Sequence, residues 1–172
     1  EVKLSYLYRL APVHSRLRGM ICRLQDIGGE RDMGPILEIS DLKKLARKRV
    51  PKLFFDYADS GSYTESTYRA NESDFAKIKL RQRVLVDMSG RTLETTMIGE
   101  KVKMPVALSP TGLTGMQHAD GEILGAKAAK AFGIPFTLST MSICSIEDIA
   151  EHTGRHPFWF QVYVMRDRDF IN

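Results

Sequence analysis

Two polar side chains interrupt an apolar run near the end of the sequence. Residues 158–164 are mostly aromatic or β-branched, which predicts a buried strand, yet they include Gln161 and Tyr163. Alternate residues of a strand face the same side of a sheet, so this amide and this phenol share one face. Burying them without partners would be costly. They therefore either contact a ligand or belong to a hydrogen-bond network inside the protein.

Two earlier apolar runs also end in polar or turn-forming residues. The first leads into Pro110, Thr111 and Gly112, and the second ends at Ser139. Helical patterns separate the three runs, which indicates a parallel sheet covered on its faces. The carboxyl ends of such strands are open for chemistry. Ser139 has a simpler alternative role, which is to cap the loop that follows it. The expected strands are 106–109, 135–139 and 158–164, and the expected helices are 118–132 and 145–152, the second capped by Ser145 with Asp148 three residues on.

The turn after the first expected strand argues against a dinucleotide-binding fold. That fold needs Gly-x-Gly-x-x-Gly directly after its first strand. Residues 109–115 contain Pro110 where the backbone would have to wrap a pyrophosphate, and no acidic residue follows the second strand. A barrel whose strand ends contact a flat cofactor fits these residues better.

The first half of the chain is mainly helical. Apolar spacing predicts a helix over 42–50 with Ser40 or Asp41 as its cap, then a short helix through Tyr57 that ends at Gly61. Ser62 and Glu65 are expected to form a capping box for a third helix reaching about residue 75. A polar, Thr-rich segment over 90–99 reads as extended. We expect residues 1–34 to be a poorly ordered extension and residues 35–172 to belong to the folded barrel.

Composition excludes several classes of protein. The chain is 43% hydrophobic and 27% charged, as in ordinary globular proteins, and it has no apolar run long enough to span a membrane. The net charge of +4 is scattered, so no nucleic-acid partner is expected. Cys22 and Cys144 match no metal or redox spacing, and no metal site is predicted.

Five short segments in order resemble the FMN-dependent α-hydroxy-acid dehydrogenases and oxidases, and most closely their bacterial L-lactate dehydrogenase branch. Each segment is weak alone, but their spacing fits successive βα units. The resemblance covers residues 36–172 and implies an α/β fold: the first three βα units of a (β/α)8 TIM barrel, preceded by an N-terminal helical segment. The segments are Asp-Tyr-Ala-Asp-Ser-Gly at 56–61, Ser-Pro-Thr-Gly at 109–112, His-Ala-Asp-Gly-Glu at 118–122, Leu-Ser-Thr at 138–140 and Phe-Gln-Val-Tyr at 160–163.

The resemblance also implies substrate-binding roles for two tyrosines. In this family a 2-hydroxy acid lies over the flavin, and a hydride equivalent passes to the flavin N5. Tyr57 matches the residue that binds the substrate carboxylate, a task suited to an uncharged phenol. Tyr163 matches a residue that hydrogen-bonds the substrate near the reacting carbon. Periodicity alone favours a core aromatic with a hydrogen-bonded hydroxyl at Tyr57, and it is the motif that favours substrate binding.

The cofactor-binding residues implied by the resemblance lie at the strand ends. Pro110, Thr111 and Gly112 are expected against the middle ring of FMN, with a backbone N–H near N5. Ser139 and Gln161 match residues that hydrogen-bond the flavin. Many relatives carry Ala where this chain has Gly112, which implies extra space beside N5 for a larger substrate or for oxygen.

The resemblance implies no catalytic residue within this sequence. The family's proton-abstracting histidine, its partner arginine, the lysine near flavin N1 and the phosphate-binding loops all belong farther along the barrel, which needs about 250 residues. His118 follows the first strand, but a capping or structural role accounts for it.

Two functions remain open. The first is the amino-terminal part of a flavoprotein that oxidises L-lactate or a similar 2-hydroxy acid to the 2-keto acid, with a quinone, a cytochrome or oxygen as electron acceptor. Such a protein is expected to form homo-oligomers in the cytoplasm or peripherally on the inner membrane. The alternative is a truncated, non-catalytic remnant or interaction module, inactive because it lacks the histidine.

Overall fold

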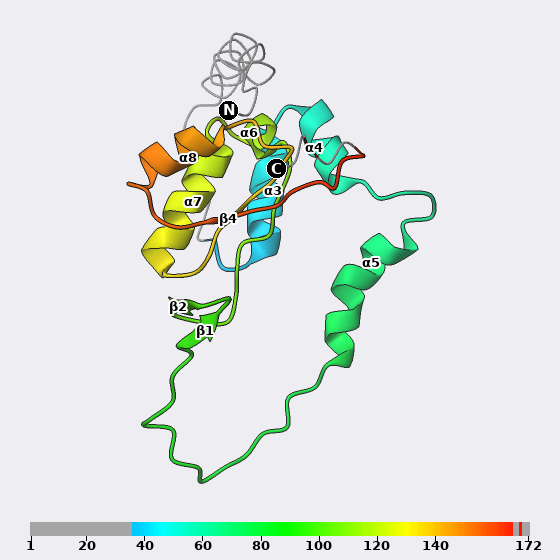
Figure 1. The fold of residues 1–172 in the computed structure, drawn as a ribbon. Helices are drawn as coiled ribbons and strands as arrows, with labels where there is room; N and C mark the ends of the chain where they lie inside the picture. The colour runs from blue at the N-terminus through cyan, green and yellow to red at the C-terminus, as the bar shows by residue number, and fades with distance from the viewer. Residues whose placement is uncertain (1–35, 167–168, 170–172) are drawn as a thin grey trace.

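The computed structural model describes residues 36–166 and residue 169 (Figure 1). The expected extension over residues 1–34 therefore lies outside the described residues. Helices and short strands follow one another along the chain as α3 (Ile39–Arg49), α4 (Lys52–Asp59), α5 (Ser66–Ser73), a 3₁₀ turn η1 (Asp74–Lys77), β1 (Thr95–Met97), β2 (Glu100–Val102), α6 (Thr114–Gln117), α7 (Gly121–Phe132), β3 (Thr137–Leu138), α8 (Ile146–His152) and β4 (Trp159–Phe160).

Three chain segments run parallel to one another, as the sequence predicts. Leu108 pairs with Phe136 through a single parallel bridge, and β3 pairs in parallel with β4. The pairing continues past β4, where Gln161 N donates to Leu138 O at 2.9 Å. Helix α7 connects the first two segments and α8 connects the second to the third, so the chain forms consecutive βα units.

The paired strands are shorter than the sequence predicts. Only Leu108 of the first expected strand pairs, and β4 ends at Phe160 rather than at residue 164. Val162 and Val164 are exposed at 52% and 74%. Within residues 36–166 no strand lies on the far side of β4, so Val162 and Val164 have no further strand to pair with there.

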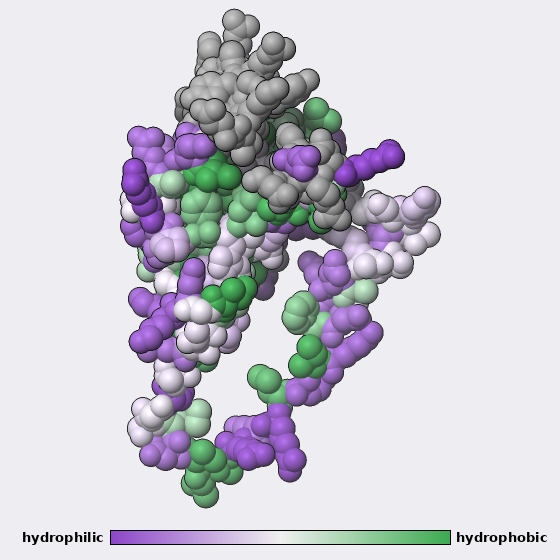
Figure 2. Space-filling view, in the orientation of Figure 1, coloured by the Kyte–Doolittle hydropathy of each residue, from purple (hydrophilic) through white to green (hydrophobic). Residues whose placement is uncertain are grey.

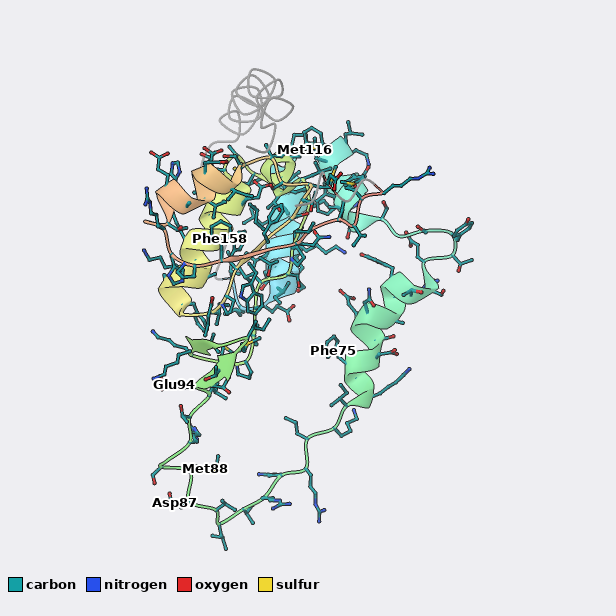
Figure 3. The ribbon with its side chains drawn as sticks, in the orientation of Figure 1. Phe75, Asp87, Met88, Glu94, Met116 and Phe158 are labelled. Atoms are coloured by element: carbon teal, nitrogen blue, oxygen red, sulfur yellow. The ribbon has the colours of Figure 1, made fainter. Side chains whose placement is uncertain are left out.

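The core lies between the two helices and the parallel segments. Small residues of α7, among them Ala126 and Ala129, let the helix approach the sheet closely, and a Cβ at Gly125 would lie 3.3 Å from the ring of Phe136. Phe158, labelled in Figure 3, packs against the edge of this cluster. The buried members are Ile123, Ala126, Ala129, Phe136, Leu138, Cys144 and Ile149.

Helix capping follows the sequence at one end of the chain and departs from it at the other. Ser145 caps α8 by accepting from Asp148 N at 3.0 Å, and Asp148 returns the bond to Ser145 N at 3.1 Å, as predicted. The expected cap of α3 was wrong: Glu38 is the cap, and Asp41 accepts from its backbone N–H because it lies three residues into the helix.

The expected capping box at Ser62 and Glu65 was also wrong. Helix α5 begins only at Ser66, and Glu65 adopts a left-handed φ of 55° in front of it. The Glu65 carboxylate instead accepts from Gly61 N at 3.1 Å, which closes the turn after α4. The Thr-rich segment is a strand only over Thr95–Met97, where β1 pairs with β2 in an antiparallel hairpin.

A long arm connects α5 to β1 and stands apart from the helices in Figure 1. Phe75, Asp87, Met88 and Glu94 mark its course in Figure 3. Its apolar side chains are exposed, and Figure 2 shows them as separate hydrophobic patches. Within the described residues nothing covers this surface.

We predict that the 172-residue chain expressed alone will not unfold cooperatively. The free edge of β4 and the uncovered apolar arm leave surface that favours association over a compact monomer. Calorimetry and light scattering on the isolated chain, with the natural-length protein as control, test this. A sharp thermal transition from a monomer would contradict it.

Candidate active site at the strand ends

The predicted cofactor residues lie at the carboxyl ends of the three parallel segments. The first segment leads into Gly112, the second ends at Ser139, and the third at Gln161. Parallel pairing brings these ends to one edge of the sheet.

Ser139 and Gln161 are joined directly. The buried Ser139 hydroxyl lies 3.2 Å from Gln161 Oε1, to which it donates. Its oxygen also accepts from Met141 N at 3.1 Å, so it caps the loop after β3 as well. Ser139 therefore has the loop-capping role, and its hydrogen bond to the flavin stays a prediction.

The amide nitrogen of Gln161 is available for a further partner. Within residues 36–166 the structure gives it no hydrogen-bond acceptor, and the side chain is only half-buried. A neighbouring hydroxyl, Thr140 Oγ1, donates to Gln161 O and accepts from Tyr163 N at 3.3 Å. The strand end thus has a fixed backbone and a free amide NH2 group at Gln161.

Gly112 lies against the loop that Ser139 begins. A Cβ at this position would lie 3.1 Å from Met141 Cβ and 3.6 Å from Ser139 Oγ. The two turns are also linked by backbone, because Leu113 N donates to Met141 O at 2.8 Å. The glycine therefore leaves a narrow space that Met141 borders.

The turn before α6 is strained and internally bonded. Leu113 adopts a left-handed φ of 57°, which costs a non-glycine residue about 1–3 kcal/mol. Thr114 Oγ1 donates to Thr111 O at 2.9 Å, and the Thr111 hydroxyl lies 3.4 Å from Ser109 O. Pro110, Thr111 and Gly112 are exposed at this edge, where a ligand can reach them.

The two predicted substrate-binding tyrosines are exposed. Tyr163 is 43% exposed and lies two residues beyond Gln161. Tyr57 lies on α4 and is 68% exposed, so within the described residues it is not a core aromatic. Helix α4 is held to the first βα loop by Gln117, whose amide donates to Phe54 O at 2.8 Å. Among the described residues no hydrogen bond joins the Tyr57 hydroxyl to Gly112, Ser139 or Gln161.

His118 makes a local contact that explains it structurally. Its Nδ1 lies 2.7 Å from Ala119 O, and its backbone N–H closes α6 by donating to Thr114 O. Within the described residues no group of three or more metal-ligating side chains occurs, and no helix there is long and apolar enough to cross a membrane.

Sequence reasoning gave no role to Glu122, which lies directly behind these turns. It is 2% exposed, and Oε1 accepts from Gly115 N and Ile143 N, each at 3.0 Å. An acidic residue in the first turn of a helix ordinarily indicates a solvated partner of the helix dipole. The helical pattern of residues 118–132 alone could not show that this carboxylate turns inward.

A charged cluster braces α4 from the other side. Lys43 of α3 forms an ion pair with Asp59, and the Tyr68 hydroxyl of α5 donates to Asp59 at 2.9 Å. The Lys43 hydrogen bond, supported by the one from Tyr68, holds the pKa of Asp59 below its ordinary 3.8 despite partial desolvation. The pKa of Lys43 is raised by its hydrogen bond to Asp59 and by a second one to the Tyr68 hydroxyl, 2.9 Å away. The cluster joins three helices next to Tyr57.

The geometry and the donor set fit a flavin. A flat ring with polar edges would meet a backbone turn without a Cβ at Gly112 and the free amide NH2 of Gln161, whose oxygen is held by the Ser139 hydroxyl. The fold is that of an α/β protein built from consecutive parallel βα units, and the candidate site lies at the strand ends.

Comparison with known proteins identifies the family. Residues 46–172 match the model of the FMN-dependent dehydrogenase family. The chain belongs to this family, whose cofactor is FMN and whose fold is the TIM barrel.

Relatives with solved structures or curated descriptions agree. The chain is 53% identical over 132 residues to an L-lactate dehydrogenase of Vibrio cholerae serotype O1, covering 77% of this chain and 35% of that protein. A soluble mutant of the membrane-associated (S)-mandelate dehydrogenase from Pseudomonas putida superposes with a TM-score of 0.71 at 38% identity, over 77% of this chain and 38% of that one. A mandelate oxidase gives 0.72 at 33%, over 78% and 39%. The chain thus spans about a third of its curated relatives' length.

We predict that the Asp59 pair stabilises the protein above about pH 4 and that this contribution is lost in acid. A carboxyl whose folded pKa lies below 3.8 binds fewer protons folded than unfolded as the pH falls through that range. The free energy of unfolding, measured with urea from pH 6 to pH 2.5, should therefore fall more steeply in the unmodified natural-length protein than in Asp59→Asn. Because Lys43 is half exposed, 1 M salt should shrink the difference. If the unfolding free energies of the two proteins depended on pH in the same way at low salt, the stabilising role of the Asp59 pair would be contradicted.

Proposed function

We propose that the natural-length protein containing this chain oxidises L-lactate, or a similar 2-hydroxy acid, to the 2-keto acid with FMN as its cofactor. The observation that supports this most is the convergence of Gly112, Ser139 and Gln161 at the ends of parallel segments in a chain of this family. The similarity to an L-lactate dehydrogenase favours lactate as the substrate.

Each residue has a defined task in this proposal. Gln161 donates its free amide to a polar edge of the flavin, and Ser139 fixes that amide by donating to its oxygen. The turn of Pro110, Thr111 and Gly112 supports the middle ring. FMN, when bound, supplies the acceptor for the hydride equivalent taken from the substrate.

The tyrosines would hold the substrate over the ring. Tyr57 donates a hydrogen bond to the carboxylate, and Tyr163 donates near the carbon that is oxidised. Both phenols are exposed at 68% and 43%, so they are accessible to a small molecule. The proton-abstracting base belongs to a part of the barrel beyond these residues.

The remaining features of the function extend the same proposal. Electrons pass from the flavin to a quinone, a cytochrome or oxygen, and the working protein is a homo-oligomer located in the cytoplasm or peripherally on the inner membrane. One solved relative, a mandelate dehydrogenase, is itself described as membrane-associated.

Anaerobic mixing of the purified natural-length protein with candidate acids tests this function. L-lactate should bleach the flavin absorbance near 450 nm, and D-lactate should not. The rate of bleaching should fall in the range of typical enzyme turnover, about 1–1000 per second. A flavin that L-lactate, glycolate and (S)-mandelate all leave unbleached would overturn the proposal and favour the non-catalytic alternative.

Replacement of Tyr57 by Phe should raise KM for L-lactate by about tenfold or more, because a hydrogen bond to a charged group contributes roughly 1.5–3 kcal/mol. FMN content should not change. The matched control is Tyr63→Phe, since Tyr63 is fully exposed at 103%. Steady-state kinetics of both variants decide the matter, and equal KM values for the two would argue against carboxylate binding by Tyr57.

Gly112→Ala should narrow the range of substrates. The added methyl would lie 3.1 Å from Met141 Cβ and would occupy space beside the proposed flavin ring. We expect kcat/KM to fall more for (S)-mandelate than for L-lactate, by about tenfold for a misfit of one methyl-sized group. Adding Met141→Ala should recover part of the loss, and an unchanged ratio between the two acids would contradict this.

A further inference from the structure

Glu122 is a buried carboxylate to which neither the family match nor the proposed function gives a task. It lies in the first turn of α7, it is 2% exposed, and its Oε2 has no hydrogen-bond partner within the described residues. Burying a carboxylate with one oxygen lacking a hydrogen bond lowers the stability of the folded state. A carboxylate buried in this way therefore calls for a specific explanation.

The bonded oxygen of Glu122 joins the two loops that form the candidate site. Oε1 accepts from Gly115 N, in the α6 segment after the first strand, and from Ile143 N, in the loop after β3. Both bonds are buried and 3.0 Å long. An acceptor oxygen has two lone pairs, and here each binds a different loop.

The contact between the loops leaves little room for adjustment. A Cβ at Gly115 would lie 2.7 Å from Ile143 Cβ, so the Gly115 backbone lies directly against the Ile143 side chain beside the carboxylate. A Cβ at Gly121 would lie 2.8 Å from Thr114 O, which fixes α7, and hence Glu122, against α6. The carboxylate is therefore held in register with both amides.

Each bond leads through a short path to a proposed flavin contact. On one side Gly115 adjoins Thr114, whose hydroxyl binds Thr111 O at 2.9 Å. On the other side Ile143 ends the loop in which Met141 N binds Ser139 Oγ at 3.1 Å. A displacement at either amide would shift the turn that faces the ring.

We propose that Glu122 is a positioning residue: its single oxygen holds the first and second βα loops in the spacing that the flavin requires. The flavin part of this proposal rests on the proposed function, whereas the clamp between the two amides does not. Without the acceptor, two buried N–H groups would lose their partner and the loops would separate.

The test uses Glu122→Ala and Glu122→Gln in the natural-length protein. Glu122→Ala removes the acceptor, and the FMN dissociation constant should rise at least about tenfold because two buried donors lose their bond. The visible circular dichroism of the bound flavin should change as well. Glu122→Gln keeps an accepting oxygen, so both readouts should stay near those of the unmodified protein. If Glu122→Ala does not fold, Glu122→Asp takes its place, since a side chain one methylene shorter cannot reach both amides.

Amide hydrogen exchange tests the clamp without flavin. Exchange at Gly115 and Ile143 should be slow in the unmodified protein and in Glu122→Gln, and faster in Glu122→Ala or Glu122→Asp. Ile149→Val serves as control: it trims a side chain that is 0% exposed in the core, so it should lower Tm while leaving the flavin spectrum unchanged.

The outcomes separate the two claims. Unmodified protein that binds no FMN would overturn the proposed function and the flavin part of the inference, while the exchange data would still decide on the clamp. Unmodified protein that binds FMN, with Glu122→Ala binding equally tightly and both amides still protected, would overturn the inference alone. A loss in Glu122→Gln as large as in Glu122→Ala would also contradict it.

Discussion

Parallel backbone pairing of three chain segments determines where the residues of the candidate site lie. Leu108 binds the segment before β3, and β3 binds β4 through to Gln161. These bonds set the register in which Gly112, Ser139 and Gln161 reach the same edge. A shift of one residue would turn the Gln161 side chain to the opposite face of the sheet, and the bond to Ser139 would be lost.

Much of this arrangement could be predicted because it depends on local patterns. Continuous apolar runs gave the order of the βα units, and Ser145 with Asp148 gave the start of α8. The period of two predicts Gln161 and Tyr163 on one face, and this stays a prediction because β4 ends at Phe160. The predicted capping box was wrong because the Glu65 carboxylate closes the turn after α4 instead. The predicted cap of α3 was wrong because Glu38 takes that position rather than Ser40 or Asp41. Several residues compete for these positions, and only tertiary contacts decide between them.

The site itself was less predictable than the fold, for a physical reason. The inward turn of Glu122 depends on where two distant backbone amides lie, and no spacing in the sequence encodes that. The lengths of the paired strands also depend on neighbours: the last residues of the predicted third strand stay unpaired because nothing flanks them among the described residues. Local patterns indicate only a flat ligand, and it is the match to the family that identifies this ligand as FMN.

If these strand ends form part of a flavin site, the protein from its natural source carries flavin, and its flavin content can be measured. The protein should be purified from its natural source, and its intact mass and its absorbance spectrum recorded together. We expect a species about twice as long as this chain or longer, because the chain covers 35% of a relative's length, and we expect one FMN bound per chain. A species of 19.5 kDa carrying no flavin would contradict it.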